Sequence, residues 1–221
     1  MLNDTKTYLR AILKAVPVKS ILELGSGLRS TPFLGNIMEQ RQGKMTTLET
    51  DPTWYQTVCE KVKFKCLTPV LCNFYFDEKL DRYTYDWTSD EKFDLILIDG
   101  PGKLRGRNLE RFEQLLGRED FCLTGMSGGP QSVSVLDYVL PFAHKDTVIV
   151  VDGRRAAVMY YLSKRSADLV YMSFGNPYIV KDLKALLKPQ FQKLAKKGIC
   201  EASAICHKDC KYLDSIPGTR M

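Results

Sequence analysis

The sequence lacks the segments that would place a protein in a membrane or in a secretory pathway. No apolar run approaches the roughly 20 residues that a membrane-spanning helix needs. The first residues, Met1–Asp4, lack the basic and then apolar pattern of a signal peptide. Seven cysteines at irregular spacing argue against a disulfide framework and for reduced thiols. We therefore expect a cytoplasmic protein.

Internal repeats and low-complexity segments are absent as well. The 221 residues are 44% hydrophobic and 26% charged, which is typical of a globular chain and not of a disordered or fibrous one. This length fits one domain with a single core. Within that domain we expect an N-terminal helix at 1–18, a core at 19–180, and a basic helix with a final strand at 181–221.

Short apolar runs alternate with helical patterns along the chain. The runs that we interpret as strands lie at 20–24, 44–49, within 64–76, and at 93–98, 147–151, 169–174 and 200–207. The helical patterns lie at 4–16, 31–40, 53–62, 104–118, 132–142, 156–164 and 181–197. Strands that are apolar on both faces and alternate with helices indicate an α/β fold, a doubly wound and mostly parallel sheet with helices on both faces. We expect 77–91 to be irregular.

Four of the predicted strands carry an acidic residue at their carboxyl end. These ends are Glu23–Gly27, Glu49–Asp51, Asp99–Pro101 and Asp152–Arg154. Ligands of open α/β sheets bind beside the carboxyl ends of the strands, so we expect a ligand site there. Glu23 is unusual because it lies within an apolar strand. A carboxylate is costly to bury there unless the protein or a ligand supplies a hydrogen bond.

The first strand end carries a glycine turn, Gly25-Ser26-Gly27. Glycine lets the chain bend tightly and lets a ligand lie against the main chain. Glu49 follows Gly25 by 24 residues, close to the spacing of about 20 at which an acid meets the ribose hydroxyls in dinucleotide sites. The dinucleotide pattern itself is broken, because Ser30 stands at its third glycine. An adenosine-containing ligand without a pyrophosphate is therefore favoured.

These residues resemble a known family. The segments Glu23–Gly27, Leu48–Trp54 and Phe93–Pro101 are similar to the first, second and fourth motifs of class I S-adenosylmethionine-dependent methyltransferases. The similarity continues in order through Val148–Arg154 and covers most of the chain. It implies a Rossmann-like, seven-stranded sheet whose last strand is antiparallel, with S-adenosylmethionine as the cofactor.

The resemblance also implies roles for individual residues. The turn formed by Gly25, Ser26 and Gly27 would lie under the methionine part of the cofactor. Glu23 would lie near the amino group of the cofactor, either directly or through a water molecule. Glu49 would hold the ribose.

Asp99 and Asp152 are the candidates for catalysis, and Asp99 is also a candidate contact of the cofactor. In metal-dependent O-methyltransferases, which this region resembles, the corresponding acids bind a divalent cation together with an asparagine. Gly153 stands at that asparagine, so a divalent metal is the less favoured alternative and we assign no metal ligand. Without a metal, Asp99 would act as a general base or orient the acceptor. A plainer alternative is that both aspartates cap the turns or helices after their strands.

The resulting prediction is a methyltransferase that transfers a methyl group to an oxygen or a nitrogen of an unidentified acceptor. A small or anionic acceptor is expected, with Lys103 and Arg107 as candidate contacts. The basic pattern at 181–197 leaves nucleic acid open, and no membrane partner is expected. Two alternatives are a non-catalytic subunit or sensor that binds the cofactor or a nucleoside, and another transferase or lyase on the same fold.

One cluster near the C-terminus contains residue types that bind soft metals. It comprises Cys200, Cys206, His207 and Cys210. The spacing does not match a paired zinc knuckle, and adjacent residues of a strand point to opposite faces. We interpret these cysteines as packed thiols.

Overall fold

The computed structural model describes residues 5–100, 131–152, 168–173, 202–217 and 219–220. Its helices are α1 (Thr5–Ala15), α2 (Ser30–Gln40), α3 (Pro52–Lys61), α5 (Gln131–Val139) and the 3-10 helix η1 (Leu140–Phe142). Its first five strands are β1 (Ser20–Leu24), β2 (Lys44–Glu49), β3 (Leu67–Leu71), β4 (Phe74–Asp77) and β5 (Arg82–Tyr85). The others are β6 (Phe93–Ile98), β7 (Ala143–Asp152), β8 (Leu169–Ser173), β9 (Ala202–His207) and β10 (Thr219–Arg220).

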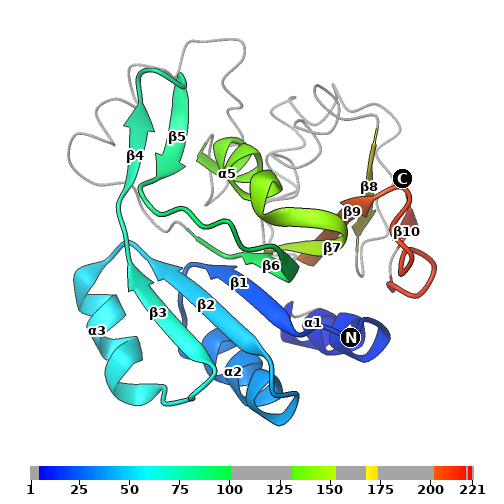
Figure 1. Ribbon diagram of the computed structural model, residues 1–221, viewed down its shortest axis with the longest axis horizontal. Helices are drawn as coiled ribbons and strands as arrows, with labels where there is room; N and C mark the ends of the chain where they lie inside the picture. The colour runs from blue at the N-terminus through cyan, green and yellow to red at the C-terminus, as the bar shows by residue number, and fades with distance from the viewer. Residues whose placement is uncertain (1–4, 101–130, 153–167, 174–201, 218, 221) are drawn as a thin grey trace, which may run out of the picture.

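Among the described residues, the main sheet has eight strands in the order β10-β8-β9-β7-β6-β1-β2-β3 (Figure 1). The pairs from β3 across to β7 are parallel. Strand β9 is antiparallel to both of its neighbours, β7 and β8. The predicted α/β, Rossmann-like sheet is therefore confirmed, with the antiparallel strand where the sequence places it. The two-residue strand β10 is an addition at the edge, antiparallel to β8.

The β4–β5 hairpin differs from the prediction. The single strand expected within 64–76 is two strands, β3 and β4, and the segment 77–91, expected to be irregular, contains β5. The hairpin is held by aromatic rings that meet across its strands. The ring centroids of Phe74 and Tyr83 lie 5.5 Å apart, and those of Phe74 and Tyr85 lie 4.8 Å apart. Polar residues between these rings mask the strand pattern in the sequence.

The sheet divides the core into two layers, with helices on both faces (Figure 1). Leu22 and Leu24 of β1 face the layer that contains α5 and the β4–β5 hairpin. Ile21 faces the layer that contains α1 and α2. This alternation follows from the period of two in a strand. All three leucine and isoleucine side chains are fully buried, so β1 is the centre of the fold.

The chain reverses its winding at β1. It adds β2 and β3 on one side of β1 and then returns to place β6 on the other side. Such a switch point opens a crevice at the carboxyl ends of the strands. There, Gly25 has a φ of 88°, and a Cβ on it would lie 2.6 Å from the backbone nitrogen of Gly100. The turns after β1 and β6 therefore touch through their backbones.

At the amino ends of the strands, opposite this crevice, a carboxylate holds the start of β1 in place. Asp94, near the start of β6, accepts hydrogen bonds from the backbone nitrogens of Lys19 at 2.8 Å and Ser20 at 3.0 Å. Burial raises the pKa of Asp94, but hydrogen bonds from Lys19, His144 and Ser20 outweigh that effect and hold the pKa below its usual value. Asp94 thus fixes the entry into β1, a role that the sequence pattern did not reveal.

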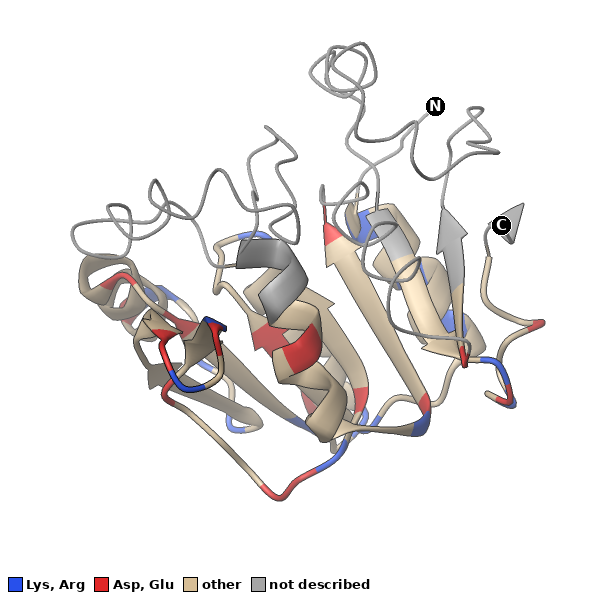
Figure 2. Cartoon of the chain, turned by 90° about the horizontal axis from the view of Figure 1, so that it is seen from above, with Lys and Arg blue, Asp and Glu red and all other residues tan. Residues whose placement is uncertain are grey.

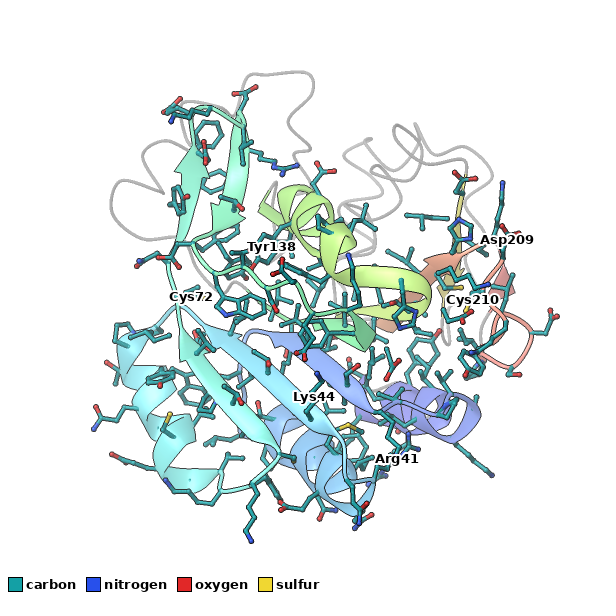
Figure 3. The ribbon with its side chains drawn as sticks, viewed as in Figure 1. Arg41, Lys44, Cys72, Tyr138, Asp209 and Cys210 are labelled. Atoms are coloured by element: carbon teal, nitrogen blue, oxygen red, sulfur yellow. The ribbon has the colours of Figure 1, made fainter. Side chains whose placement is uncertain are left out.

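Arg41, at the end of α2, supports the same region at the amino ends of the strands (Figure 3). Its guanidinium donates to the carbonyl oxygens of Val16 at 3.3 Å and Val18 at 3.2 Å, and also to that of Leu13. These three carbonyls belong to the end of α1 and to the link into β1. A single side chain therefore ties α1, α2 and β1 together.

Several predicted features lie outside the described residues. These are the helices at 104–118, 156–164 and 181–197 and the basic residues Lys103 and Arg107. On the described elements, charges of both signs are interspersed (Figure 2). No helix in this part of the chain is both long enough and apolar enough to cross a membrane.

We predict that replacing Gly25 with alanine destabilises the fold. The new Cβ would lie 2.6 Å from the backbone nitrogen of Gly100, and the alanine would have to keep the positive φ of 88°, which is unfavourable for a residue with a side chain. We expect Gly25→Ala to lower the free energy of unfolding by about 2 kcal/mol or more, measured by urea denaturation. Gly27→Ala is the matched control, because its Cβ would meet a side-chain atom, Ser30 Oγ, at 3.3 Å. Equal losses for the two variants would contradict the backbone contact.

Candidate functional site

The acids that the sequence predicts at strand ends lie together at the carboxyl ends of the parallel strands. Leu24 of β1 pairs with Leu48 of β2 and with Ile98 of β6, and Ile98 pairs with Val151 of β7. The residues that follow these four therefore stand at one level. They are Gly25, Glu49, Asp99 and Asp152, with Glu23 two residues deeper in β1.

The acids also share one face of the sheet. Leu97 and Val150, two residues before Asp99 and Asp152, belong to the layer with α1 and α2. Because side chains on a strand alternate, the two aspartates follow on that same face. Hydrogen bonds from α2 to Glu23 and from α1 to Asp152 agree with this placement. The structure thus brings the predicted residues together, and their roles stay predictions.

Glu23 is completely buried beneath the glycine turn. Its Oε2 accepts hydrogen bonds from Thr31 Oγ1 of α2 and from Thr47 Oγ1 of β2, each at 2.7 Å. Its Oε1 has no hydrogen-bond partner among the described residues. Burial raises the pKa of Glu23 to about 7 and the nearby charge of Asp99 adds to the rise, whereas the hydroxyls of Thr31, Ser30 and Thr47 lower the pKa by less.

Thr31 connects Glu23 to the glycine turn. Its hydroxyl donates to Glu23 and accepts a hydrogen bond of 2.8 Å from the backbone nitrogen of Gly27. The Thr31 hydroxyl therefore links the carboxyl group of Glu23 to the backbone of Gly27 through two hydrogen bonds. Sequence reasoning missed both Thr31 and Thr47. Thr47 lies beside Glu23 in the β1–β2 register, but it carries no distinct signal in the sequence because Thr46, Lys44 and Glu49 of the same strand are polar too.

Glu49 is nearly buried and accepts three hydrogen bonds. The backbone nitrogens of Thr50 and Asp51 donate to Oε1 at 2.7 Å and 2.9 Å. The hydroxyl of Ser26 donates to Oε2 at 2.9 Å. The glycine turn and the end of β2 are therefore joined directly, through two residues that the sequence predicts to bind one ligand.

Trp54 fixes the turn from the other side. Its indole Nε1 donates to the carbonyl oxygen of Ser26 at 2.7 Å. Trp54 itself is held at the start of α3, where Asp51 Oδ1 accepts hydrogen bonds from the backbone nitrogens of Thr53 and Trp54. Trp54 is 39% exposed, which leaves part of its ring open beside the turn.

Asp99 and Asp152 end neighbouring strands in different surroundings. Asp99 is exposed, and its backbone nitrogen donates to the carbonyl oxygen of Leu24 at 2.9 Å. Asp152 is half-buried, and its Oδ1 accepts a hydrogen bond of 2.6 Å from the hydroxyl of Thr5 at the start of α1. Asp99 is thus the better placed of the two to meet a ligand.

The remaining sequence features do not add to this site. Arg29 is exposed just before α2, and its side chain makes no capping hydrogen bond. Cys206 and Cys210 are buried in the layer with α1 and α2, as expected for packed thiols, whereas Cys200 lies outside the described residues. Within the described ranges, no group of three or more histidine, cysteine or acidic side chains is arranged to hold a metal ion.

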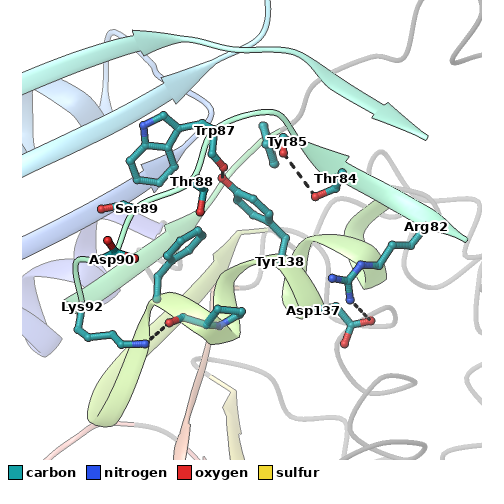
Figure 4. A pocket seen from close by; sticks show the side chains of 12 residues that line it. Arg82, Thr84, Tyr85, Trp87, Thr88, Ser89, Asp90, Lys92, Asp137 and Tyr138 are labelled. Atoms are coloured by element: carbon teal, nitrogen blue, oxygen red, sulfur yellow. Dashed lines mark hydrogen bonds and ion pairs between the residues drawn. The ribbon is translucent and has the colours of Figure 1, made fainter. Parts of the chain in front are cut away.

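A separate hollow of about 580 Å³ lies between α5, η1 and the segment that follows β5 (Figure 4). Tyr138 donates from its hydroxyl to the carbonyl oxygen of Trp87 at 2.7 Å across it. Arg82 and Asp137, 3.8 Å apart, stand at one end, and Lys92 stands at the other. Lys92 immediately precedes β6, so that end of the hollow lies at the amino ends of the strands. The hollow is therefore distinct from the edge that carries the acids.

Comparisons with known proteins identify the fold. Neither a protein-family model nor a curated protein matches the chain. The solved structure of the O-methyltransferase TomG from Streptomyces achromogenes, in complex with S-adenosylmethionine, matches with a TM-score of 0.50 at 14% identity. The match covers 90% of this chain and 78% of TomG.

The plantazolicin methyltransferase BpumL, solved with a pentazolic desmethylplantazolicin analogue and S-adenosylhomocysteine, matches with a TM-score of 0.51 at 12% identity. This match covers 92% of this chain and 85% of BpumL. At these identities the likeness establishes the fold, which is that of class I methyltransferases, and confirms the predicted sheet.

We predict that Glu23 makes the stability of the protein fall as the pH rises. The pKa of Glu23 is about 7 in the folded state and 4.5 in the reference state, so unfolding releases this proton between those values. The stability that protonation provides is complete below pH 4.5 and is lost as the pH rises through 7. The shift corresponds to roughly 3 kcal/mol at most.

The test compares the parent with Glu23→Gln, which cannot ionise, by urea denaturation at pH 5 and pH 8. We expect the variant to gain stability relative to the parent at the higher pH. Glu60→Gln, which changes an exposed acid of α3, should follow the parent at both values. A difference between parent and Glu23→Gln that does not vary with pH would contradict the assignment.

Proposed function

We propose that this chain is an S-adenosylmethionine-dependent methyltransferase that acts on an oxygen or a nitrogen of its acceptor. The observation that carries the proposal is the convergence at the switch point. A glycine turn in backbone contact with the next strand end, a buried carboxyl group and a nearly buried glutamate meet there. The two solved structures compared above were determined with S-adenosylmethionine and with S-adenosylhomocysteine.

The residues present fit this cofactor. The backbone of Gly25-Ser26-Gly27 offers a surface without bulky side chains for the methionine part. Glu49 Oε2 accepts one hydrogen bond, from Ser26, and therefore keeps a lone pair for a hydroxyl donor of the ribose. Glu23 Oε1 is an acceptor without a donor among the described residues, and its complete burial means that it acts on the amino group through a water or through its charge.

The chain's own residues would mainly align the reactants and exclude water. When bound, S-adenosylmethionine supplies a methyl group on a positively charged sulfur. Asp99, exposed at the end of β6, would accept the proton of the attacking hydroxyl or amine, or orient that group. Asp152, tied to Thr5, would assist by position rather than by taking a proton.

A small or anionic acceptor and a cytoplasmic location complete the proposal. Lys103 and Arg107, which follow β6 in the sequence, are the proposed contacts for an anionic acceptor. A divalent metal is not part of the proposal, because Gly153 replaces the asparagine of the metal-dependent pattern.

A second candidate is a non-catalytic subunit or sensor that binds the cofactor. The hydrogen bond between Thr5 and Asp152 favours it, because one predicted catalytic carboxylate is already engaged within the protein. The two candidates share the cofactor site and differ in whether a methyl group is transferred. They are therefore separated by assays of binding and of turnover on the same variants.

We predict that Glu49→Ala weakens binding of S-adenosylhomocysteine by about tenfold or more, because it removes a charge-assisted hydrogen bond to the ribose. Isothermal titration calorimetry measures the change. Glu60→Ala, an exposed acid on α3, is the control and should bind as the parent does. The cofactor assignment fails if the parent binds neither S-adenosylmethionine nor S-adenosylhomocysteine.

We also predict that Asp99→Asn lowers methyl transfer by about a hundredfold while S-adenosylhomocysteine still binds, because the amide cannot accept the acceptor's proton. Transfer is followed as radiolabelled methyl incorporated from S-adenosylmethionine into fractions of a cell extract. Asp90→Asn, an exposed acid before β6, serves as the control. Binding by the parent without transfer to any fraction would favour the sensor.

A further inference from the structure

The hydrogen bonds already made by Glu49 limit what a ligand can add. A carboxylate offers roughly four lone-pair positions, two on each oxygen. Both positions of Oε1 are used by the backbone nitrogens of Thr50 and Asp51, at 2.7 Å and 2.9 Å. One position of Oε2 is used by the hydroxyl of Ser26, at 2.9 Å. One position, on Oε2, remains for a ligand.

The two bonds to Oε1 are local and rigid. They come from the two residues that directly follow Glu49 in the chain, and Asp51 also caps α3 through Thr53 and Trp54. Releasing Oε1 would require the start of α3 to move. A ligand therefore meets Glu49 through Oε2.

The bond from Ser26 is also hard to release. Ser26 and Glu49 are each 8% exposed, so water competes little for the hydrogen bond between them. Its backbone is held as well, because Trp54 Nε1 donates to its carbonyl oxygen at 2.7 Å and Gly25 N donates to Leu48 O at 2.9 Å. Ser26 therefore stays on Oε2 when a ligand arrives.

We infer that Ser26 is a specificity-determining residue that restricts Glu49 to one hydroxyl of the ribose. The inference rests on the proposed cofactor and goes beyond it, since a carboxylate with both oxygens open would accept the two hydroxyls together. In this chain the second ribose hydroxyl makes no hydrogen bond to Glu49. Removing the Ser26 hydroxyl opens the position that this second hydroxyl needs.

The test measures the affinities of three probes by calorimetry. They are S-adenosylhomocysteine and its 2′-deoxy and 3′-deoxy analogues. We expect the parent to lose about tenfold in affinity for one analogue, whose missing hydroxyl is the one that Glu49 accepts. The other analogue should bind within about twofold of S-adenosylhomocysteine.

In Ser26→Ala, the analogue that the parent tolerates should become discriminated against by about tenfold relative to S-adenosylhomocysteine. This ratio is the readout, because a general disturbance of the turn changes all three affinities alike. Ser26→Thr keeps the hydroxyl and should retain the ratio of the parent. Ser215→Ala, an exposed serine near the C-terminus, controls for the handling of the variants.

The outcomes separate the inference from the proposed function. If the parent binds no S-adenosylhomocysteine, the cofactor proposal fails and the inference fails with it. If S-adenosylhomocysteine binds but the parent discriminates against both analogues, the inference alone is overturned. An unchanged ratio in Ser26→Ala overturns it equally, whatever the absolute affinity of that variant.

Discussion

The backbone contact between Gly25 and Gly100 is the constraint on which the candidate site depends. A Cβ on either residue would lie within 2.7 Å of backbone atoms of the other. The turns after β1 and β6 can therefore share the switch point only because neither carries a side chain. Leu24, next to this contact, pairs with both Leu48 and Ile98 and thereby sets the level of the neighbouring strand ends. The absence of side chains at these two glycines, which lets the turns touch, also leaves the main chain accessible to a ligand.

Glu23 lies directly below this contact and shows how the site is linked to the core. Two threonine hydroxyls offset part of the cost of burying its carboxyl group, one from β2 and one from α2. Burial is the main reason that the pKa is raised to about 7, and Oε1 has no hydrogen-bond partner among the described residues that would lower it further. A cation above the turn would favour the ionised form.

The parts of the fold that the sequence predicted are those in which local pattern and tertiary packing agree. Strand β2 was predicted over the residues that form it, 44–49, and the following Thr50-Asp51-Pro52 marks its end. The β4–β5 hairpin was missed because its aromatic contacts join residues across the turn. The bond from Ser26 to Glu49 was missed for a related reason. Both residues were predicted to face the ligand, and a residue pattern carries no information on whether two such side chains bond each other first.

The hydrogen bond from Ser26 to Glu49 means that part of the candidate site is ordered in the absence of a ligand. A carboxylate that binds ribose but is exposed to solvent before binding would be hydrated and mobile, and a ligand would have to order it. Here Glu49 is ordered before any ligand binds, by Thr50 and Asp51 from its own strand end and by Ser26 from the glycine turn. Binding then costs less in ordering but offers fewer new hydrogen bonds. Affinity at such a site therefore combines the fit to the turn held by Trp54 with the hydrogen bond that Glu49 Oε2 can still accept.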